Sequence, residues 1–130
     1  MSAADASHPL VLARALTQRA QQLCIGLESG VADLYELVTP TTAELLHWWF
    51  GDGAREGRPY NFHAGQRQAI LNVIVAHEVL DSPDLPDLYR QVCADALLTG
   101  SRLSEVSQPK HAHPKYCLKM ATGTGKTWVL

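Results

Sequence analysis

A glycine-rich loop late in the sequence constrains the fold of this chain more than any other feature. The loop consists of Thr122, Gly123, Thr124, Gly125, Lys126 and Thr127. Glycine tolerates the tight backbone turn that points successive N–H groups at a phosphate. Residues 116–120, just before the loop, form a mostly apolar and aromatic run that is typical of a buried strand. A strand, a glycine-rich turn and a helix are the local parts of an α/β nucleotide-binding fold.

The side chains of the loop suit a nucleoside triphosphate bound with magnesium. The ammonium of Lys126 can reach the β- and γ-phosphates, and the hydroxyl of Thr127 can ligate the Mg²⁺ that bridges them. The core pattern GxGK[ST] is present, although the longer phosphate-loop pattern has a glycine where this chain has Met120. The alternative is a Gly-Thr-rich turn beside an exposed lysine, which the apolar run before the loop disfavours. Lys126 and Thr127 are therefore the candidate catalytic residues, with Thr127 as the candidate metal ligand.

Residues 120–127 (MATGTGKT) resemble motif I of superfamily two helicases. The resemblance is closest to the branch that holds the type I and type III restriction translocating subunits and the helicase/UvrB-like N-terminal domains. It covers residues 58–130, and residues 38–46 also resemble the N-terminal region of type III-like restriction subunits. The resemblance implies a RecA-like P-loop NTPase domain with ATP-dependent helicase or translocase activity. It implies double-stranded DNA as a partner, with a modification subunit as a further candidate.

Residues 59–70 resemble the Q motif of the same family, with Gln66 at the position of the glutamine that contacts adenine. A carboxamide can pair with adenine N6 and N7 through one acceptor and one donor, which favours ATP over GTP. The chain departs from the family pattern because Arg58-Pro59-Tyr60 lies earlier than the usual arginine-proline-aromatic run. The distance from Gln66 to Gly123 is also longer than in compact members. The alternative is that Gln66 is an exposed residue in the first turn of a helix.

Glycines and polar residues at 51–58 (GDGAREGR) suggest a linker between two parts of the chain. The first part, residues 1–52, is expected to be a helical N-terminal region. The second, residues 58–130, is expected to be the beginning of the ATP-binding domain. The fold class is therefore α/β, with a chain that is itself predominantly α.

Hydrophobic periodicity predicts several helices before the loop. They are expected over residues 8–28, with Gly30 ending the helix, over 31–38, from the capping-box pair Thr41 and Glu44 onward, over 63–80, and from Ser82-Pro83 to about Gly100. In the last of these, the apolar stripe consists of Leu85, Leu88, Tyr89, Val92 and Ala96. Trp48, Trp49 and Phe50 are three adjacent aromatic residues that could stack on nucleic-acid bases. Without interleaved basic residues, they are expected in the core or on a docking surface.

Three histidines and one cysteine are candidates either for metal ligands or for structural residues. His77 lies on the predicted inner face of the 63–80 helix and is expected to be a core histidine. His111, His113 and Cys117 have donor groups that suit zinc, but zinc sites usually have paired ligands at both ends of the motif. A solvated pair of loop histidines is the favoured interpretation.

Composition excludes several classes of protein. Apolar residues make up 46% and charged residues 18% of the chain, as in folded soluble proteins. No apolar run has the length of a membrane span, and three widely spaced cysteines fit a reducing, cytoplasmic setting. The net charge of −2 disfavours this chain as the main nucleic-acid-binding surface.

These patterns predict ATP and Mg²⁺ binding in an N-terminal fragment of a helicase-like motor. A later acidic motif and an arginine from a second lobe would complete the catalytic site, so the 130 residues alone are expected to show no ATPase turnover. One alternative is a non-catalytic helical interaction module with a remnant loop. Another is a P-loop ATPase outside the helicases.

Overall fold

Every regular element in the described part of the chain is a helix. The computed structural model describes residues 10–82 and 84–98. The helices are α2 (Val11–Leu23), α3 (Leu34–Leu37), α4 (Pro40–Phe50), α5 (Asp52–Glu56), α6 (Ala64–Ile74), the π-helix η1 (Val75–Val79), α7 (Leu85–Cys93) and the 3-10 helix η2 (Ala94–Leu98). The expectation of a predominantly α chain is confirmed for these residues. The predicted strand at 116–120 and the loop at 122–127 lie outside them.

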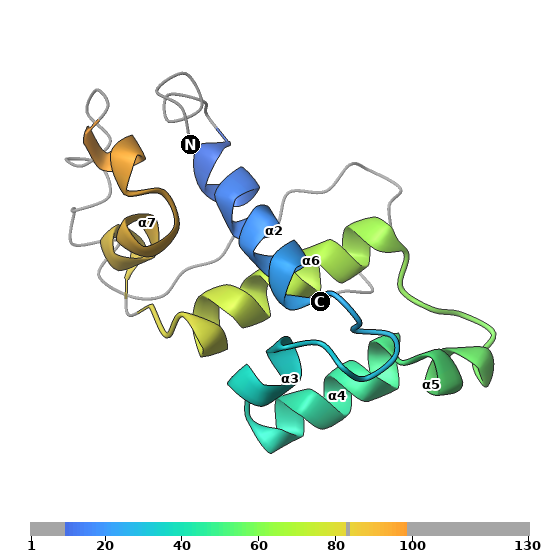
Figure 1. Ribbon diagram of the computed structural model, residues 1–130. Coiled ribbons are helices and arrows are strands. Elements are labelled where there is room, and N and C mark those ends of the chain that lie inside the picture. Colours follow the sequence, from blue (N-terminus) through green and yellow to red (C-terminus); the bar gives the residue numbers. More distant parts are fainter. Residues whose placement is uncertain (1–9, 83, 99–130) are drawn as a thin grey trace.

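Helix α2 lies between α7 on one side and α6 on the other. It packs against α6 and η1, and separately against α7 (Figure 1). Helix α3 contacts both α4 and η1, while α5 follows α4 directly. Because η1 continues α6 without a break, the two form one helical rod. None of the described helices has the length and apolar character needed to cross a membrane.

One large buried cluster holds these helices together. Leu27, Leu34 and Leu46 each have an exposed fraction of 0%, and Val75 from η1 joins them in the same cluster. Each buried aliphatic side chain stabilises the fold by about 1.5–3 kcal/mol. The cluster draws residues from both sides of the predicted 51–58 linker, which itself contains α5. The two segments therefore share one core here, and the division into two parts stays a prediction.

The first predicted helix ends earlier than its hydrophobic pattern suggests. Helix α2 stops at Leu23, and turns follow over residues 24–30. Gly26 has φ +83° and Gly30 has φ +77°, a region that side chains other than glycine rarely adopt. A Cβ at Gly26 would lie 2.6 Å from Val31 Cγ2, so the turn needs glycine there for space as well. Gly30 was predicted to end the helix, but the chain has already left it by Gly26.

The N-cap of α4 lies two residues before the predicted capping residue, Thr41. Thr39 is the N-cap, and its Oγ1 accepts a hydrogen bond from the Thr42 N–H at 3.2 Å. Pro40 occupies the first helical position, where its fixed φ fits and its missing N–H costs nothing. The predicted capping box of Thr41 and Glu44 is therefore wrong, because Pro40 places the cap at Thr39.

Glu78 ties the π-helix η1 to the beginning of α4. The Thr39 N–H donates to Glu78 Oε1 at 2.9 Å, and the Thr42 hydroxyl donates to Glu78 Oε2 at 2.5 Å. Burial raises the pKa of the Glu78 carboxyl, but these hydrogen bonds and the nearby His77 favour the carboxylate. The net result is a pKa below the ordinary value of 4.5.

Acid should weaken the fold through Glu78. A carboxylate whose pKa is lowered by folding contributes stability above its unfolded pKa, here near 4.5, and loses it as the pH falls through the folded value. The free energy of unfolding, measured with urea, should therefore fall more between neutral and acidic pH in the parent chain than in Glu78→Gln. The glutamine side chain cannot titrate. Glu44→Gln on the exposed side of α4 is the control and should keep the parent's pH dependence. Identical pH profiles for the parent and Glu78→Gln would contradict this assignment.

The buried face of the 63–80 segment differs from the predicted one. Leu71, Val75 and Ala76 are buried, whereas His77 is exposed. Leu71 and Val75 are four residues apart and share one face of the helix, and a residue two positions after Val75 lies on the far side. The prediction that His77 is a core histidine is therefore wrong, because the predicted inner face lies beside the one that is buried.

The stripe of α7 was predicted correctly, although its start was not. Asp84 is the N-cap, and its Oδ1 accepts a hydrogen bond from the Asp87 N–H at 2.9 Å. The predicted start at Ser82-Pro83 is therefore too early. Leu88, Tyr89 and Ala96 are buried as expected. Leu85 and Val92 are half-buried and pack against the same clusters.

The three adjacent aromatic residues have different environments. Phe50 is buried, and Trp49 packs edge-on against Phe62 with ring centroids 6.0 Å apart. Trp48 is 58% exposed, with the Arg58 guanidinium 5.0 Å from its ring centroid. The core expectation is confirmed for Phe50 and Trp49. Trp48 lies outside the core, because successive helical residues point about 100° apart, and a docking role for it stays a prediction.

Candidate nucleotide-binding site

Gln66, the candidate adenine contact, lies in the first turn of α6 and helps to cap it. His63 is the N-cap residue, and its Nδ1 accepts hydrogen bonds from the N–H groups of Gly65 (3.1 Å) and Gln66 (3.3 Å). In return, Gln66 Oε1 accepts a hydrogen bond from the His63 N–H at 3.0 Å. This is a reciprocal capping box with histidine in the position that serine or threonine usually holds. An accepting Nδ1 places the proton of neutral His63 on Nε2.

The side chain of Gln66 is enclosed. Its exposed fraction is 3%, so the alternative of an exposed first-turn residue is wrong about exposure. The capping bond uses one of the two lone pairs of the carboxamide oxygen. Adenine pairing would need the second lone pair together with an N–H of the same group. The contact with adenine stays a prediction.

A small hollow borders this helix start. Its volume is about 160 Å³, and its lining includes Phe62 and Ala64, which flank the capping histidine. Arg67, the residue after Gln66, also lines it and forms an ion pair with Glu28 at 2.7 Å. Ligand pockets usually begin at about 300 Å³, so this hollow is too small for a whole nucleotide. It offers an aromatic wall beside a paired arginine and carboxylate.

Two titratable groups near the Arg67–Glu28 ion pair have raised pKa values. Burial raises the pKa of the Cys24 thiol, although the nearby Arg67 partly lowers it. Burial likewise raises the pKa of Tyr35, whose hydroxyl donates to the Leu27 carbonyl at 2.6 Å. A thiol with a raised pKa is a poor nucleophile at neutral pH. Cys24 is therefore part of the packing and is not a reactive group.

Most of the residues predicted for the site lie outside the described part of the chain. They are Thr122, Gly123, Thr124, Gly125, Lys126 and Thr127. His111, His113 and Cys117, for which zinc binding was the disfavoured interpretation, lie outside it as well. Within residues 10–82 and 84–98, no group of three or more His, Cys, Asp or Glu side chains could hold a metal ion. The predicted Mg²⁺ ligand Thr127 therefore stays a prediction.

The sequence contained a signal for His63 that the motif comparison did not use. The spacing His-x-x-Gln at residues 63–66 matches the spacing of a capping box. Read in that way, it predicts both the start of α6 and the structural role of Gln66.

Comparisons with known proteins do not place the chain in a class. No protein-family model matches it, and neither the curated proteins nor the solved structures contain a match. The class of protein therefore rests on the chemistry of the sequence motifs.

Proposed function

We propose that residues 122–127 bind the phosphates of ATP with Mg²⁺, at the start of a RecA-like P-loop domain of a helicase or translocase. The observation that carries the proposal is the sequence MATGTGKT at residues 120–127. Gly123 and Gly125 supply the turn, Lys126 neutralises charge on the β- and γ-phosphates, and Thr127 ligates the metal. Double-stranded DNA is the proposed track, with a modification subunit as a further partner. The buried free cysteines Cys24 and Cys93 suit a reducing cytoplasm.

Gln66 gives the proposed site its preference for adenine. A capping box fixes the direction of its side chain, so the carboxamide does not need to be ordered when the nucleotide binds. A carboxamide has an oxygen that can accept from adenine N6–H and a nitrogen that can donate to N7. Guanine presents an acceptor where adenine presents that donor, so the same pairing fails with GTP.

One substitution can separate the capping role of Gln66 from its proposed contact with adenine. Gln66→Glu keeps oxygens that can accept from the His63 N–H, but the carboxylate has no N–H for adenine N7. The parent chain should prefer ATP to GTP, and the variant should lose that preference by a factor of about 5 to 150. Nucleotide affinities can be measured by calorimetry in the presence of Mg²⁺, with thermal unfolding to check that the variant folds.

Gln68→Glu is the matched control. Gln68 lies two residues further along α6 and donates to Asn72 Oδ1 at 2.8 Å, so its replacement should leave the ATP preference intact. Equal affinity for ATP and GTP in the parent chain would remove Gln66 from the proposed site. Loss of the preference in both variants would point to general damage to α6.

A non-catalytic interaction module is the rival proposal. It is supported by apolar side chains on the outer face of α4, where Leu45 is 40% and Trp48 is 58% exposed. Such a module would bind no nucleotide, so the experiments on ATP separate the two proposals. A P-loop ATPase outside the helicases would bind ATP as well, but DNA would not stimulate its activity.

A further inference from the structure

Two arginines on α2 differ from the paired arginines elsewhere in the described chain. Arg55 and Arg67 form ion pairs with carboxylates. Within residues 10–82 and 84–98, Arg14 makes no side-chain hydrogen bond or ion pair. There Arg19 makes only a long 3.5 Å contact with the Gln91 carbonyl. Two guanidinium groups on one helix are thus left without a carboxylate partner in the described structure.

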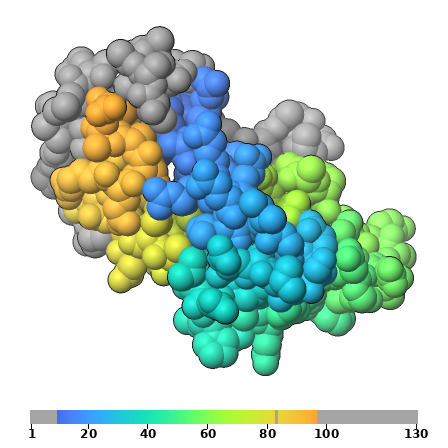
Figure 2. All heavy atoms as spheres, viewed as in Figure 1, coloured from blue at the N-terminus to red at the C-terminus, as the bar shows by residue number. Residues whose placement is uncertain are grey.

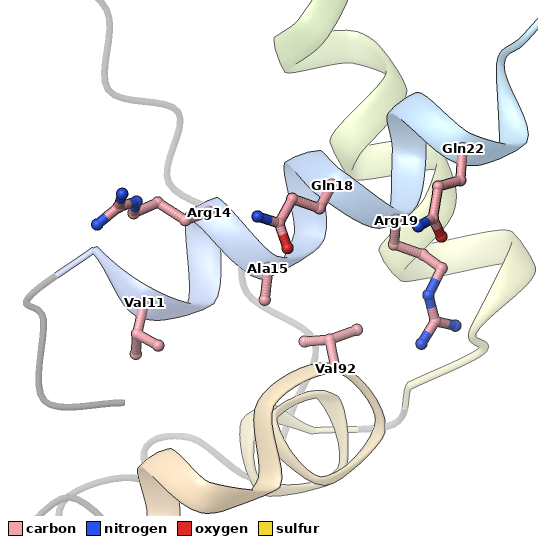
Figure 3. A pocket seen from close by; sticks show the side chains of 7 residues that line it. All are labelled: Val11, Arg14, Ala15, Gln18, Arg19, Gln22 and Val92. Atoms are coloured by element: carbon pink, nitrogen blue, oxygen red, sulfur yellow. The ribbon is translucent and has the colours of Figure 1, made fainter. Parts of the chain in front are cut away.

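Both arginines line a hollow between α2 and α7. Figure 2 shows a gap between the surfaces of these helices, and Figure 3 shows the lining side chains. The volume of the hollow is about 320 Å³. Arg14, Gln18 and Gln22 follow one another at four-residue spacing, so they share one face of α2. Arg19 projects toward α7 from the neighbouring turn (Figure 3).

The lining combines three kinds of chemistry. The guanidinium groups are suited to bidentate recognition of an anion, and the planar fork of arginine matches phosphate oxygens. The carboxamides of Gln18 and Gln22 both donate and accept hydrogen bonds, as base edges require. Val92 from α7 gives the hollow an apolar wall. Among the described residues, no aspartate or glutamate lines it.

We propose that this hollow binds one phosphate-bearing nucleotide unit, either as a free mononucleotide or as part of a single nucleic-acid strand. Its volume reaches the lower end of the range for ligand pockets, about 300 Å³, and so exceeds what a bare anion fills. Arg14 and Arg19 lie at opposite ends of the hollow (Figure 3), so one guanidinium group binds the phosphate of the unit and the other can bind a neighbouring phosphate when the unit belongs to a strand. The carboxamides contact the base edge, and the apolar wall packs against the ring. The proposal does not depend on the loop at residues 122–127, so either can fail without the other.

Two probes distinguish the sources of the phosphate. The first is a fluorescein-labelled thymidine oligonucleotide, followed by fluorescence anisotropy; the second is AMP, followed by calorimetry. AMP lacks the β- and γ-phosphates that Lys126 is proposed to bind. The test variant is Arg14→Ala/Arg19→Ala, and the matched control is Arg90→Ala, an exposed arginine on α7 that does not line the hollow.

The double variant should bind the oligonucleotide about 100-fold more weakly, since it loses two phosphate contacts and each charged hydrogen bond contributes about tenfold or more. AMP has one phosphate, so its affinity should fall by about tenfold. If the oligonucleotide responds, the slope of log affinity against log salt should also decrease by about 1.4, for two lost phosphate contacts. Arg90→Ala should behave like the parent chain in both assays. Thermal unfolding should be unchanged in all three proteins, because none of these arginines lies in the buried clusters.

Each outcome has a defined meaning. Loss of oligonucleotide binding in the double variant alone supports a strand as the source. Loss of AMP binding alone, with no oligonucleotide binding, supports a free nucleotide. Failure of both probes to bind the parent chain overturns the proposal, and so does an equal loss in Arg90→Ala.

Discussion

Replacing Lys126 by alanine is expected to reduce the affinity for MgATP by about 10- to 100-fold. The ammonium group is proposed to bind phosphate oxygens, and hydrogen bonds between charged groups contribute about 1.5–3 kcal/mol. Alanine removes the charge and leaves the glycine turn unchanged. Calorimetric titration of the parent and variant chains with ATP in excess Mg²⁺ measures the difference directly.

Lys119 offers a matched control for this substitution. It lies before the loop, in the predicted strand at residues 116–120, and is assigned no contact with phosphate. Lys119→Ala should therefore bind MgATP as the parent does. If both lysine variants lose affinity to the same degree, the effect is a general one of charge and not of the loop.

Replacing Leu46 by alanine is expected to destabilise the fold by about 2–5 kcal/mol. Leu46 has an exposed fraction of 0% and belongs to the cluster that joins α2, α4, α6 and η1. Truncation removes buried apolar surface and leaves a cavity that the surrounding helices fill only in part. Domains usually have a free energy of unfolding of about 5–15 kcal/mol, so this loss is a large share of the total. Urea unfolding followed by circular dichroism measures it.

The adjacent residue provides the control. Leu45 lies on the same helix but is 40% exposed, so Leu45→Ala should change the free energy of unfolding by less than about 1 kcal/mol. The two variants remove the same atoms from neighbouring positions, and helix propensity favours alanine equally in both. Similar losses at the two positions would show that α4 does not pack through the Leu46 face.

The helical character of the described chain could be predicted from its periodicity, but the limits of several helices could not. The stripe of Leu88, Tyr89 and Ala96 is a local property, because residues three, four and seven apart share one face of a helix. The early end of α2 depends on Gly26 approaching Val31, and the start of α4 depends on Pro40. In both cases the sequence offers more than one residue at which the helix could begin or end, and hydrophobic periodicity does not distinguish between them.

The orientation of the 63–80 segment could not be predicted for a different reason. Apolar residues occur on neighbouring faces of this segment, and hydrophobic spacing alone does not show which face is buried. His77 was therefore placed on the inner face, whereas the structure exposes it and places Val75 and Ala76 inside. Glu78 then reaches Thr39, which lies 39 residues earlier in the chain. Contacts over such distances follow from the assembled fold.

For the candidate site, the sequence predicted the motif residues but not their surroundings. The sequence singled out Gln66, and the structure shows what the motif could not, namely that the side chain is buried and caps α6. The hollow beside Arg14 and Arg19 had no sequence signal, because one wall comes from α2 and the other from α7. Its arginines are scattered in a chain of net charge −2, so composition argued against an anion site. Only the packing of the two helices brings the groups together.

The central claim, that the loop at residues 122–127 binds MgATP, can be tested residue by residue with selectively ¹⁵N-glycine-labelled protein. The chain contains nine glycines, and the N–H groups of Gly123 and Gly125 are the ones proposed to point at phosphate. Adding MgATP to about 10 mM detects even millimolar affinity. If the loop binds MgATP, the N–H signals of Gly123 and Gly125 should shift, and those of Gly26 and Gly30 should not. Lys126→Ala should suppress the shifts. Unchanged Gly123 and Gly125 signals at that concentration, or equal shifts in Lys126→Ala, would contradict this claim.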